Sequence, residues 1–216
     1  MEKGKLSDNL NYLLELLRKE GIDNENILNA ISKVPRENFV SEIQREYAYE
    51  NRPLPIPCGQ TISQPYTVAF MLLLLEVKPA EKILEVGTGS GYEAALLAEL
   101  GANVYTIERI PELANYAQRN IKKLGYKVDI SVGDGTLGLE DKAPFDGIIV
   151  SAAAPSVPES LTVQLKPEGK IVIPVGDRFS QKILCGKKIS VGRKFLMEYS
   201  SYENFVFVPL IGKDGF

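Results

Sequence analysis

The chain has 216 residues, of which 44% are hydrophobic, enough to bury one full core and a small appended lobe. Its 25 lysines and arginines against 28 aspartates and glutamates give a net charge of −3. This balance offers no basic surface for a phosphate backbone and argues against nucleic acid as the main substrate. The chain contains no histidine, which excludes a Ser-His-Asp triad, a Cys-His dyad and a histidine-dependent metal site.

The two cysteines and the apolar runs indicate the cellular setting. Cys58 and Cys185 are not spaced for metal binding and are read as free thiols, so we expect no metal. The longest apolar run, Val68 to Leu75, is too short to span a bilayer, and no charged and apolar leader is present. We therefore expect a soluble, cytoplasmic protein with no membrane partner.

The first part of the chain is expected to form two short helices and then a loop. Leucines at helical spacing precede Gly21, and a second apolar pattern ends near Pro35. From Glu46 to Gln64 the prolines exclude a regular helix or a central strand. This stretch carries too many aromatic and aliphatic residues for disorder, so we expect an ordered loop that lies over the cofactor. A helical run then extends to Leu75.

A glycine-rich loop follows the first predicted buried strand. Residues 83–91 read Ile-Leu-Glu-Val-Gly-Thr-Gly-Ser-Gly, and the unbroken apolar run is typical of a buried parallel strand. Gly87, Gly89 and Gly91 allow a tight turn and a close approach of the backbone to a ligand. Residues 92–100 have helical composition and end at Gly101, so the unit predicts the start of a nucleotide-binding βαβ motif. A tight turn without a ligand is the alternative.

The residues around this loop distinguish between cofactors. The dinucleotide fingerprint has glycines at relative positions one, three and six, whereas the sixth position here is Tyr92. Glu85, an acidic residue before the first glycine, is similar to the first motif of S-adenosylmethionine-dependent methyltransferases. Glu108 ends the strand predicted at 103–108, where a carboxylate can accept hydrogen bonds from both ribose hydroxyls. A solvated glutamate at a strand end is the alternative.

A third acidic position follows the strand predicted at 128–132. Asp134 stands between Gly133 and Gly135, where methyltransferases place an aspartate that can accept a hydrogen bond from the adenine amino group. A plain turn, which Gly-Asp-Gly favours by itself, is the alternative. The three acidic positions in this order favour a methyltransferase over a dehydrogenase and predict S-adenosyl-L-methionine as the cofactor.

The remaining elements continue the alternation of strand and helix. Pro111 opens a helix that reaches Gly125, and strands are predicted at 145–150 and 170–175. Residues 183–191 and 205–209 are expected to pair as a hairpin, because no helix-length apolar pattern separates them. We therefore predict a single α/β domain over 1–216, Rossmann-like and doubly wound, with a mostly parallel sheet of about seven strands and an antiparallel edge. Residues 1–78 would form the N-terminal helical extension and substrate-covering loop, and 79–216 the cofactor-binding core.

Several segments occur in an order that carries a specific resemblance. From about Val34 to Leu210 the chain resembles the protein-L-isoaspartate O-methyltransferases, and Gln60-Thr61-Ile62-Ser63-Gln64-Pro65 is the most discriminating segment. The other matching segments are Pro53-Leu54-Pro55-Ile56, the glycine-rich loop, Glu108-Arg109-Ile110-Pro111, Gly133-Asp134-Gly135, Ala152-Ala153-Ala154-Pro155 and Pro174-Val175-Gly176.

The resemblance implies transfer of a methyl group from S-adenosyl-L-methionine to the free α-carboxylate of L-isoaspartyl residues in damaged proteins and peptides. The ester then collapses to a succinimide that can reopen to normal aspartate, which is protein repair. The partners would be isoaspartyl proteins, with no nucleic acid, and the enzyme would act as a monomer. By this resemblance the cofactor-binding residues are Glu85, Gly87, Thr88, Gly89, Gly91, Glu108, Arg109, Asp134 and Gly135, and the substrate-binding residues are Ile62, Ser63, Gln64, Ala154 and Pro155.

Ser63 is the catalytic residue that the resemblance implies, since its hydroxyl can donate a hydrogen bond to the substrate carboxylate. A nucleophilic role is not expected, because no base is available to activate it. Ser63 also precedes Gln64, Pro65 and a helical run, so an N-capping role is the alternative. Plain loop is the alternative for Ala154 and Pro155.

Two departures from the family pattern are visible, Asn51 in place of a common aspartate and Tyr66 in place of a common histidine. They leave open a narrower activity on aspartates of dedicated peptide substrates. A module that binds S-adenosylmethionine without catalysis, and a dehydrogenase, are the alternatives from other classes. The intact Thr-Ile-Ser segment argues against the first, and Tyr92 with Asp134 argues against the second.

Overall fold

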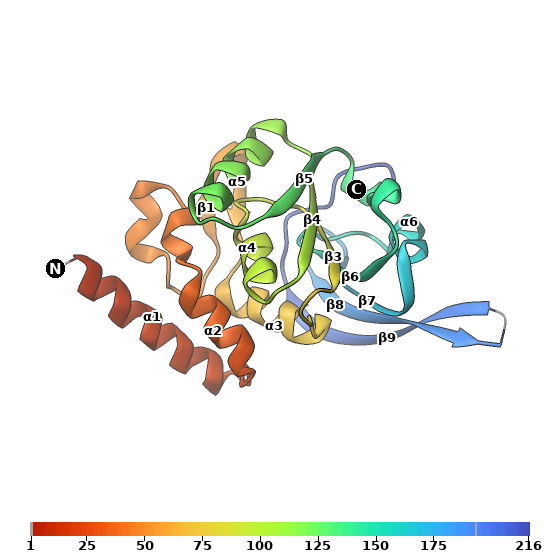
Figure 1. Ribbon diagram of the computed structural model, residues 1–216, viewed down its shortest axis with the longest axis horizontal. Coiled ribbons are helices and arrows are strands. Elements are labelled where there is room, and N and C mark those ends of the chain that lie inside the picture. Colours follow the sequence, from red (N-terminus) through yellow and green to blue (C-terminus); the bar gives the residue numbers. More distant parts are fainter. Residues whose placement is uncertain (1, 193) are drawn as a thin grey trace.

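The computed structural model describes residues 2–192 and 194–216, which form a seven-stranded sheet flanked by helices (Figure 1). The strand order is β5-β4-β3-β6-β7-β8-β9. The first four neighbouring pairs are parallel, and β7-β8 and β8-β9 are antiparallel. The strands are β3 (Lys82–Val86), β4 (Asn103–Glu108), β5 (Val128–Val132), β6 (Phe145–Val150), β7 (Leu165–Gly176), β8 (Gln181–Val191) and β9 (Lys194–Phe205). The predicted mostly parallel sheet with an antiparallel edge is confirmed.

The helices cover both faces of the sheet and extend beyond one side of it. They are α1 (Glu2–Lys19), α2 (Glu25–Lys33), α3 (Pro65–Leu75), α4 (Tyr92–Glu99), α5 (Pro111–Lys123) and α6 (Glu159–Val163). Helix α2 begins after Asn24, whose side chain accepts hydrogen bonds from the amides of Asn26 and Ile27 at 3.0 and 3.3 Å. Figure 1 shows α1 and α2 lying together outside α3 and α4, which confirms the predicted N-terminal helical extension.

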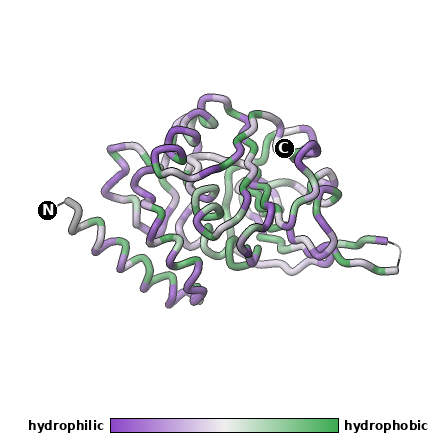
Figure 2. Tube along the Cα trace, in the orientation of Figure 1, coloured by the Kyte–Doolittle hydropathy of each residue, from purple (hydrophilic) through white to green (hydrophobic). Residues whose placement is uncertain are grey.

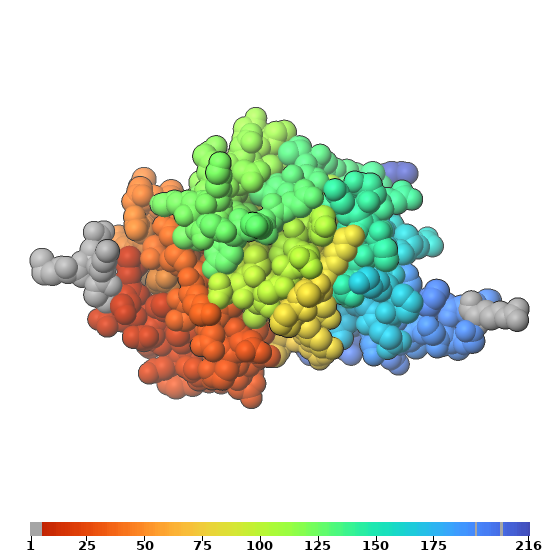
Figure 3. Space-filling view, viewed as in Figure 1, coloured from red at the N-terminus to blue at the C-terminus, as the bar shows by residue number. Residues whose placement is uncertain are grey.

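The apolar residues form two clusters, one on each face of the sheet. The larger cluster includes Leu13 and Leu17 of α1 together with Ile83 of β3 and Ile149 of β6, so the N-terminal helices and the sheet share one core. The second cluster lies under α6 and the C-terminal residues. Figure 2 shows the hydrophobic colouring along the central strands and inner helix faces, and Figure 3 shows the N-terminal residues packed directly against the rest of the molecule.

The Pro-rich stretch before α3 is ordered and contains a small hairpin that the sequence did not predict. Strands β1 (Leu54–Ile56) and β2 (Gln60–Ile62) pair antiparallel around a single 3₁₀ turn, as a sheet separate from the main one. Pairing of Leu54 with Ile62 turns both side chains into the core, where they are buried. The hairpin therefore fixes the backbone that leads into Ser63 and α3.

One predicted strand is wrong. The second strand of the C-terminal hairpin is Lys194–Phe205, not 205–209. Strand β9 lies at the edge of the sheet, and its apolar residues neither form a continuous run nor alternate strictly with polar residues, since Phe195 and Leu196 are adjacent and exposed. The apolar residues Phe207, Val208 and Leu210 instead pack onto the body of the molecule after the strand ends.

Candidate active site

A cleft opens at the carboxyl ends of β3, β4 and β6, the edge where ligands of open α/β sheets bind. Counted together with its open mouth, it has a volume of about 850 Å³. Its lining comes from the segment before α3, the glycine-rich loop with the start of α4, the end of β4 with the start of α5, the residues that follow β5 and β6, and the C-terminal residues. The main lining residues are Gln60, Thr61, Ile62, Ser63, Glu85, Gly87, Thr88, Gly89, Tyr92, Glu93, Ile107, Glu108, Arg109, Ile110, Leu113, Gly135, Ser151, Val208, Leu210 and Ile211.

The glycine-rich loop presents backbone rather than side chains to the cleft. Gly87 and Gly89 have positive φ angles of 94° and 55°, which a residue with a side chain rarely adopts. Gly91 has a different role, because it does not line the cleft and a Cβ there would lie 2.8 Å from Cδ1 of Ile121. It therefore permits the close packing of α4 against α5.

Two buried carboxyl groups form the floor of the cleft. Glu85 at the end of β3 is fully buried, and its Oε2 accepts a 2.6 Å hydrogen bond from the Thr106 hydroxyl. The Thr106 oxygen lies 2.7 Å from the hydroxyl of Thr88, which completes a chain of hydrogen bonds from the loop to Glu85. Glu93, in the first turn of α4, is 8% exposed and accepts a hydrogen bond from the Ser151 hydroxyl.

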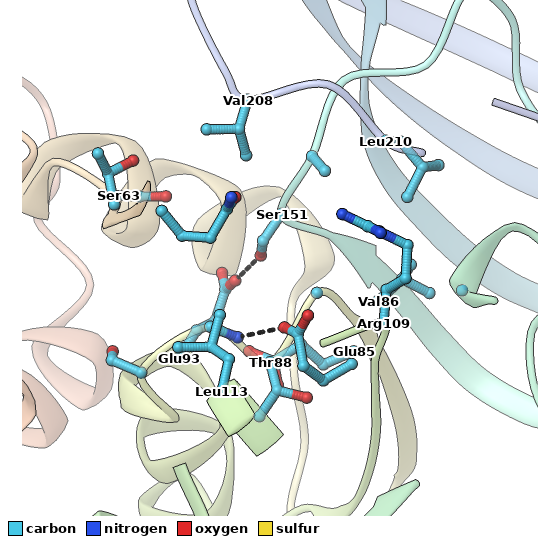
Figure 4. A pocket seen from close by; sticks show the side chains of 18 of the residues that line it. Ser63, Glu85, Val86, Thr88, Glu93, Arg109, Leu113, Ser151, Val208 and Leu210 are labelled. Carbon is cyan, nitrogen blue, oxygen red and sulfur yellow. Dashed lines mark hydrogen bonds between the residues drawn. The ribbon is translucent and has the colours of Figure 1, made fainter. Parts of the chain in front are cut away.

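Burial changes the acidity of both carboxyl groups. It raises the pKa of Glu85 well above the ordinary value, and the nearby charge of Glu93 raises it further. Burial also raises the pKa of Glu93 to about 7, against the opposing effect of the Ser151 hydrogen bond. Figure 4 shows Glu93 pointing toward Ser151, with Ser63 on one side of the cleft and Arg109 on the other.

Glu108 closes the glycine-rich loop onto the end of β4. Its Oε2 accepts a hydrogen bond from the amide of Gly89, and its Oε1 accepts one from the amide of Ile110, both at 3.0 Å. Each carboxylate oxygen retains a second acceptor position toward the cleft. Its place at the end of the second strand of the βαβ unit is the one predicted for a ribose-binding carboxylate.

Asp134 lies beside the cleft and holds the C-terminal residues. Its Oδ1 accepts hydrogen bonds from the amide and hydroxyl of Thr136 at 2.9 and 2.7 Å, and its Oδ2 accepts one from the amide of Lys213 at 2.8 Å. Partial burial acts to raise its pKa, but these hydrogen bonds and the charge of Arg109 bring the pKa below its ordinary value. Residues 208–216, here called the C-terminal strap, form one wall of the cleft through Val208 to Ile211.

Ser63 lines the cleft opposite the glycine-rich loop, and a buried arginine fixes its backbone. Nη2 of Arg36 donates a 2.7 Å hydrogen bond to the Ser63 carbonyl, and Nε donates to the Ala48 carbonyl at 2.8 Å. The guanidinium of Arg36 also lies over the ring of Tyr92, 4.9 Å from its centre. Arg36 therefore joins the segment that carries Ser63 to the first residue of α4.

The alternative of an N-capping role for Ser63 is wrong. Gln64, not Ser63, is the N-cap of α3, and it makes no side-chain capping hydrogen bond. The amide of Tyr66 instead donates to Oδ1 of Asn51 at 3.0 Å. The two positions that depart from the family pattern thus contact each other at the start of α3, and the Ser63 hydroxyl is not required there.

The structure brings most of the predicted site residues to one cleft. Ile62, Ser63, Glu85, Gly87, Thr88, Gly89, Glu108, Arg109 and Gly135 all line it, whereas Gln64, Gly91, Asp134, Ala154 and Pro155 are not among the lining residues. Ala154 is fully buried, and its amide donates to the Pro174 carbonyl at 3.0 Å, so it supports the edge of β7.

Sequence reasoning did not identify Glu93, Ser151, Arg36 or the C-terminal strap as parts of the site. A signal for Glu93 was present, because it is a charged residue at the start of a short helix that otherwise has only apolar residues until Glu99. The strap carried no such signal, since its contact with the cleft depends on how the chain returns after β9.

Comparisons with known proteins define the class first. A solved protein-L-isoaspartate O-methyltransferase superposes with a TM-score of 0.82 at 26% identity, over 95% of this chain and 66% of that chain. A solved structure titled as a putative protein-L-isoaspartate O-methyltransferase from Plasmodium falciparum, in complex with S-adenosyl-L-homocysteine, gives 0.77 at 27% identity, over 93% of this chain and 97% of that chain. The fold is the Rossmann-like fold of S-adenosylmethionine-dependent methyltransferases.

The sequence comparisons define the family. The model of the protein-L-isoaspartate(D-aspartate) O-methyltransferase family matches residues 8–215. The protein-L-isoaspartate O-methyltransferase of Methanopyrus kandleri is 50% identical over 210 residues, covering 94% of this chain and 92% of the relative. That of Chlorobaculum tepidum is 50% identical over 200 residues, covering 92% of each chain. The chain belongs to the protein-L-isoaspartate(D-aspartate) O-methyltransferase family, which removes the dehydrogenase alternative.

Across the described residues, every helix is too short or too polar to traverse a bilayer. Both cysteines are free thiols, with Cys58 exposed at the surface.

Proposed function

We propose that this protein transfers a methyl group from S-adenosyl-L-methionine to the α-carboxylate of L-isoaspartyl residues in damaged proteins and peptides. The observation that carries the proposal is one cleft with Ser63 on one wall and the glycine-rich loop on the other, in a chain without histidine. A carboxylate with an ordinary pKa of roughly 3.5 to 4 is already ionised at neutral pH and needs no base. An acceptor of this kind suits a site that can position a nucleophile but has no imidazole to activate one.

The residues of the cleft fit the cofactor. Gly87 and Gly89 leave room for a ligand beside the backbone, and Glu108 offers free acceptor positions to ribose hydroxyls. Ile107, Ile110, Leu113 and Leu210 provide apolar surface for a purine. When bound, S-adenosylmethionine supplies an electrophilic methyl group on a positively charged sulfur. The proposed cofactor-binding residues are Glu85, Gly87, Thr88, Gly89, Gly91, Glu108, Arg109, Asp134 and Gly135, with Gly91 and Asp134 acting through the shape of the cleft.

Ser63 is proposed to orient the acceptor. Its hydroxyl can donate to one oxygen of the substrate carboxylate, and Arg36 holds the Ser63 backbone in place while β1 and β2 cover the cleft. Exclusion of water by this segment removes the hydration shell of the carboxylate and strengthens the hydrogen bond from Ser63. Ile62 and Gln64 flank Ser63 and are proposed to contact the substrate, with Ala154 and Pro155 supporting the rim near β7.

Methyl transfer to paired synthetic peptides that differ only in an aspartyl or isoaspartyl linkage tests the proposal. We expect methyl ester on the isoaspartyl peptide alone, followed by succinimide formation as the ester collapses. Methylation of the aspartyl peptide alone would contradict the proposed acceptor and support the narrower activity on normal aspartates. Binding of S-adenosylhomocysteine without transfer to either peptide would support a non-catalytic binding module.

We further propose that residues 1–216 act as one domain and as a monomer, in the cytoplasm, with no nucleic acid partner. The shared core of the N-terminal helices and the sheet supports one domain. The free thiols suit a reducing compartment, and the net charge of −3 disfavours nucleic acid. Size-exclusion chromatography with light scattering tests the monomer, for which we expect the 23.9 kDa mass of one chain.

A further inference from the structure

The floor of the cleft holds Glu93, a carboxyl group to which the proposed transfer gives no role, together with Glu85, which is already proposed to bind the cofactor. Glu85 Oε2 accepts from Thr106, and Glu93 Oε2 accepts from Ser151. Within the described residues, the other oxygen of each group, Oε1, is buried and has no hydrogen-bond partner. Both side chains line the cleft, and both are more than nine-tenths buried.

An unpaired buried carboxylate oxygen calls for a donor with positive charge. Burying a carboxylate without such a partner costs several kcal/mol in general, so natural sites supply a cation or a ligand. A further charged group that acts on this pair is another carboxylate, Glu108 at the end of β4. Its negative charge also raises the pKa of Glu85. Among the described residues that shift the pKa of these two glutamates there is no lysine or arginine, and Arg109 acts instead on Asp134.

The chemistry of the missing partner follows from Glu93. Its Oε1 needs a hydrogen-bond donor and lies at the cleft in the first turn of α4, whereas the carboxyl group of Glu85 is also stabilised by the backbone amide of Ala94. A sulfonium has charge but no hydrogen to donate, whereas an ammonium group has both the charge and three N–H donors. A primary ammonium group therefore suits the unpartnered Oε1 of Glu93.

We infer that Glu93 receives the α-ammonium group at the methionine end of S-adenosylmethionine. The inference depends on the proposed function for the identity of the ligand. Ser151 is the positioning residue, because its hydroxyl holds Glu93 Oε2 and leaves Oε1 toward the cleft. The ammonium group also offsets negative charge on the cleft floor before an anionic acceptor enters opposite it.

Calorimetry with two neutral-sulfur ligands tests this assignment. S-adenosylhomocysteine keeps the ammonium group, whereas 5′-methylthioadenosine lacks the whole amino-acid end. We expect Glu93→Gln to bind S-adenosylhomocysteine about 10-fold or more weakly than the wild type, as for a lost hydrogen bond to a charged group, with methylthioadenosine binding unchanged. Glu112→Gln is the matched control, because Glu112 is the second residue of α5, as Glu93 is of α4, but its side chain is exposed. We expect the Glu112→Gln variant to bind both ligands with the affinity of the wild type.

The outcomes separate this inference from the proposed function. Equal affinity of the wild type and Glu93→Gln for S-adenosylhomocysteine would overturn the inference without affecting the acceptor. If Glu93→Gln weakens both ligands, the substitution has disturbed the whole cleft, and Ser151→Ala then decides. The inference requires that Ser151→Ala weakens the binding of S-adenosylhomocysteine but not that of methylthioadenosine. If the affinity for both ligands is unchanged, or falls equally, the inference is overturned. Failure of the wild type to methylate isoaspartyl peptide, with these binding differences intact, would refute only the proposed acceptor.

Discussion

The buried carboxyl of Glu93 makes the stability of the ligand-free protein depend on pH. Burial raises the pKa of Glu93 from 4.5 to about 7 in the folded chain. Between these values the folded protein keeps a proton that the unfolded chain has released, so the free energy of unfolding falls as the pH rises. At ~1.4 kcal/mol for each pH unit, the loss reaches about 3 kcal/mol above pH 7.

The substitution Glu93→Gln should remove most of this loss. Glutamine has nearly the same shape, can still accept a hydrogen bond from Ser151, and carries no charge to bury. We therefore expect the variant to gain about 3 kcal/mol in the free energy of unfolding at pH 8 and nothing near pH 4.5. A decline with rising pH should remain in the variant, because burial also raises the pKa of Glu85.

Urea unfolding followed by far-ultraviolet circular dichroism, from pH 4.5 to pH 8, measures the effect. Glu112→Gln is again the control, since it makes the same chemical change at the same helical position in water. It should shift stability by a few tenths of a kcal/mol at every pH, as expected for a charge near a helix N-terminus. Parallel curves for the wild type and Glu93→Gln would refute the reasoning, because they would mean that the Glu93 carboxylate is not costly to bury.

The remaining predictions concern the walls of the cleft. Ser63→Ala should bind S-adenosylhomocysteine within about 2-fold of the wild type but lose about 10-fold or more in kcat on an isoaspartyl peptide, and near-normal turnover would rule out its orienting role. Arg36→Met should lower the free energy of unfolding by about 3 kcal/mol in urea, because two hydrogen bonds from a charged group to backbone carbonyls are lost. In the ligand-free protein, Asp134→Ala should increase the rate of limited proteolysis in the C-terminal strap, because the hydrogen bond from the Lys213 amide is lost. If Asp134 served only to bind adenine, the cleavage rate would not change. Asn51→Asp should raise the free energy of unfolding, measured in urea at pH 7, by about 0.3–1 kcal/mol, because a carboxylate would then accept the hydrogen bond from the Tyr66 amide near the start of α3. An unchanged or lower free energy of unfolding would contradict this.

The sequence predicts the centre of the fold because strong local patterns coincide there. Strand β3 is a continuous apolar run before glycines, and β4 and β6 have matching apolar patterns that fit a sheet buried on both faces. The predicted bounds of β4 and β6 agree with the structure for this reason, and those of the edge strand β5 agree because its apolar residues alternate with polar ones. Strand β9 was misplaced because its apolar residues follow no regular alternation, so its pairing with β8 and not a sequence pattern defines it.

The candidate site could be predicted only as far as the motifs reach. The glycine-rich loop, Glu108 and Ser63 are in motifs that carry their own chemistry, and all of them line the cleft. Asp134 was assigned to adenine, yet its carboxylate also accepts a hydrogen bond from the amide of Lys213, 79 positions later in the chain. Contacts of that sequence separation depend on the complete topology, and local spacing cannot reveal them.

Arg36 has a consequence for how the two halves of the site communicate. Its guanidinium contacts the ring of Tyr92 at the start of α4 and the carbonyl of Ser63 on the opposite wall, so a single side chain connects two residues that line the cleft. A movement of α4 around the proposed cofactor would therefore act on Ser63, the residue proposed to orient the acceptor. Thermodynamic linkage requires such coupling to act equally in both directions. The factor by which bound cofactor raises the affinity for the acceptor should therefore equal the factor by which bound acceptor raises the affinity for the cofactor.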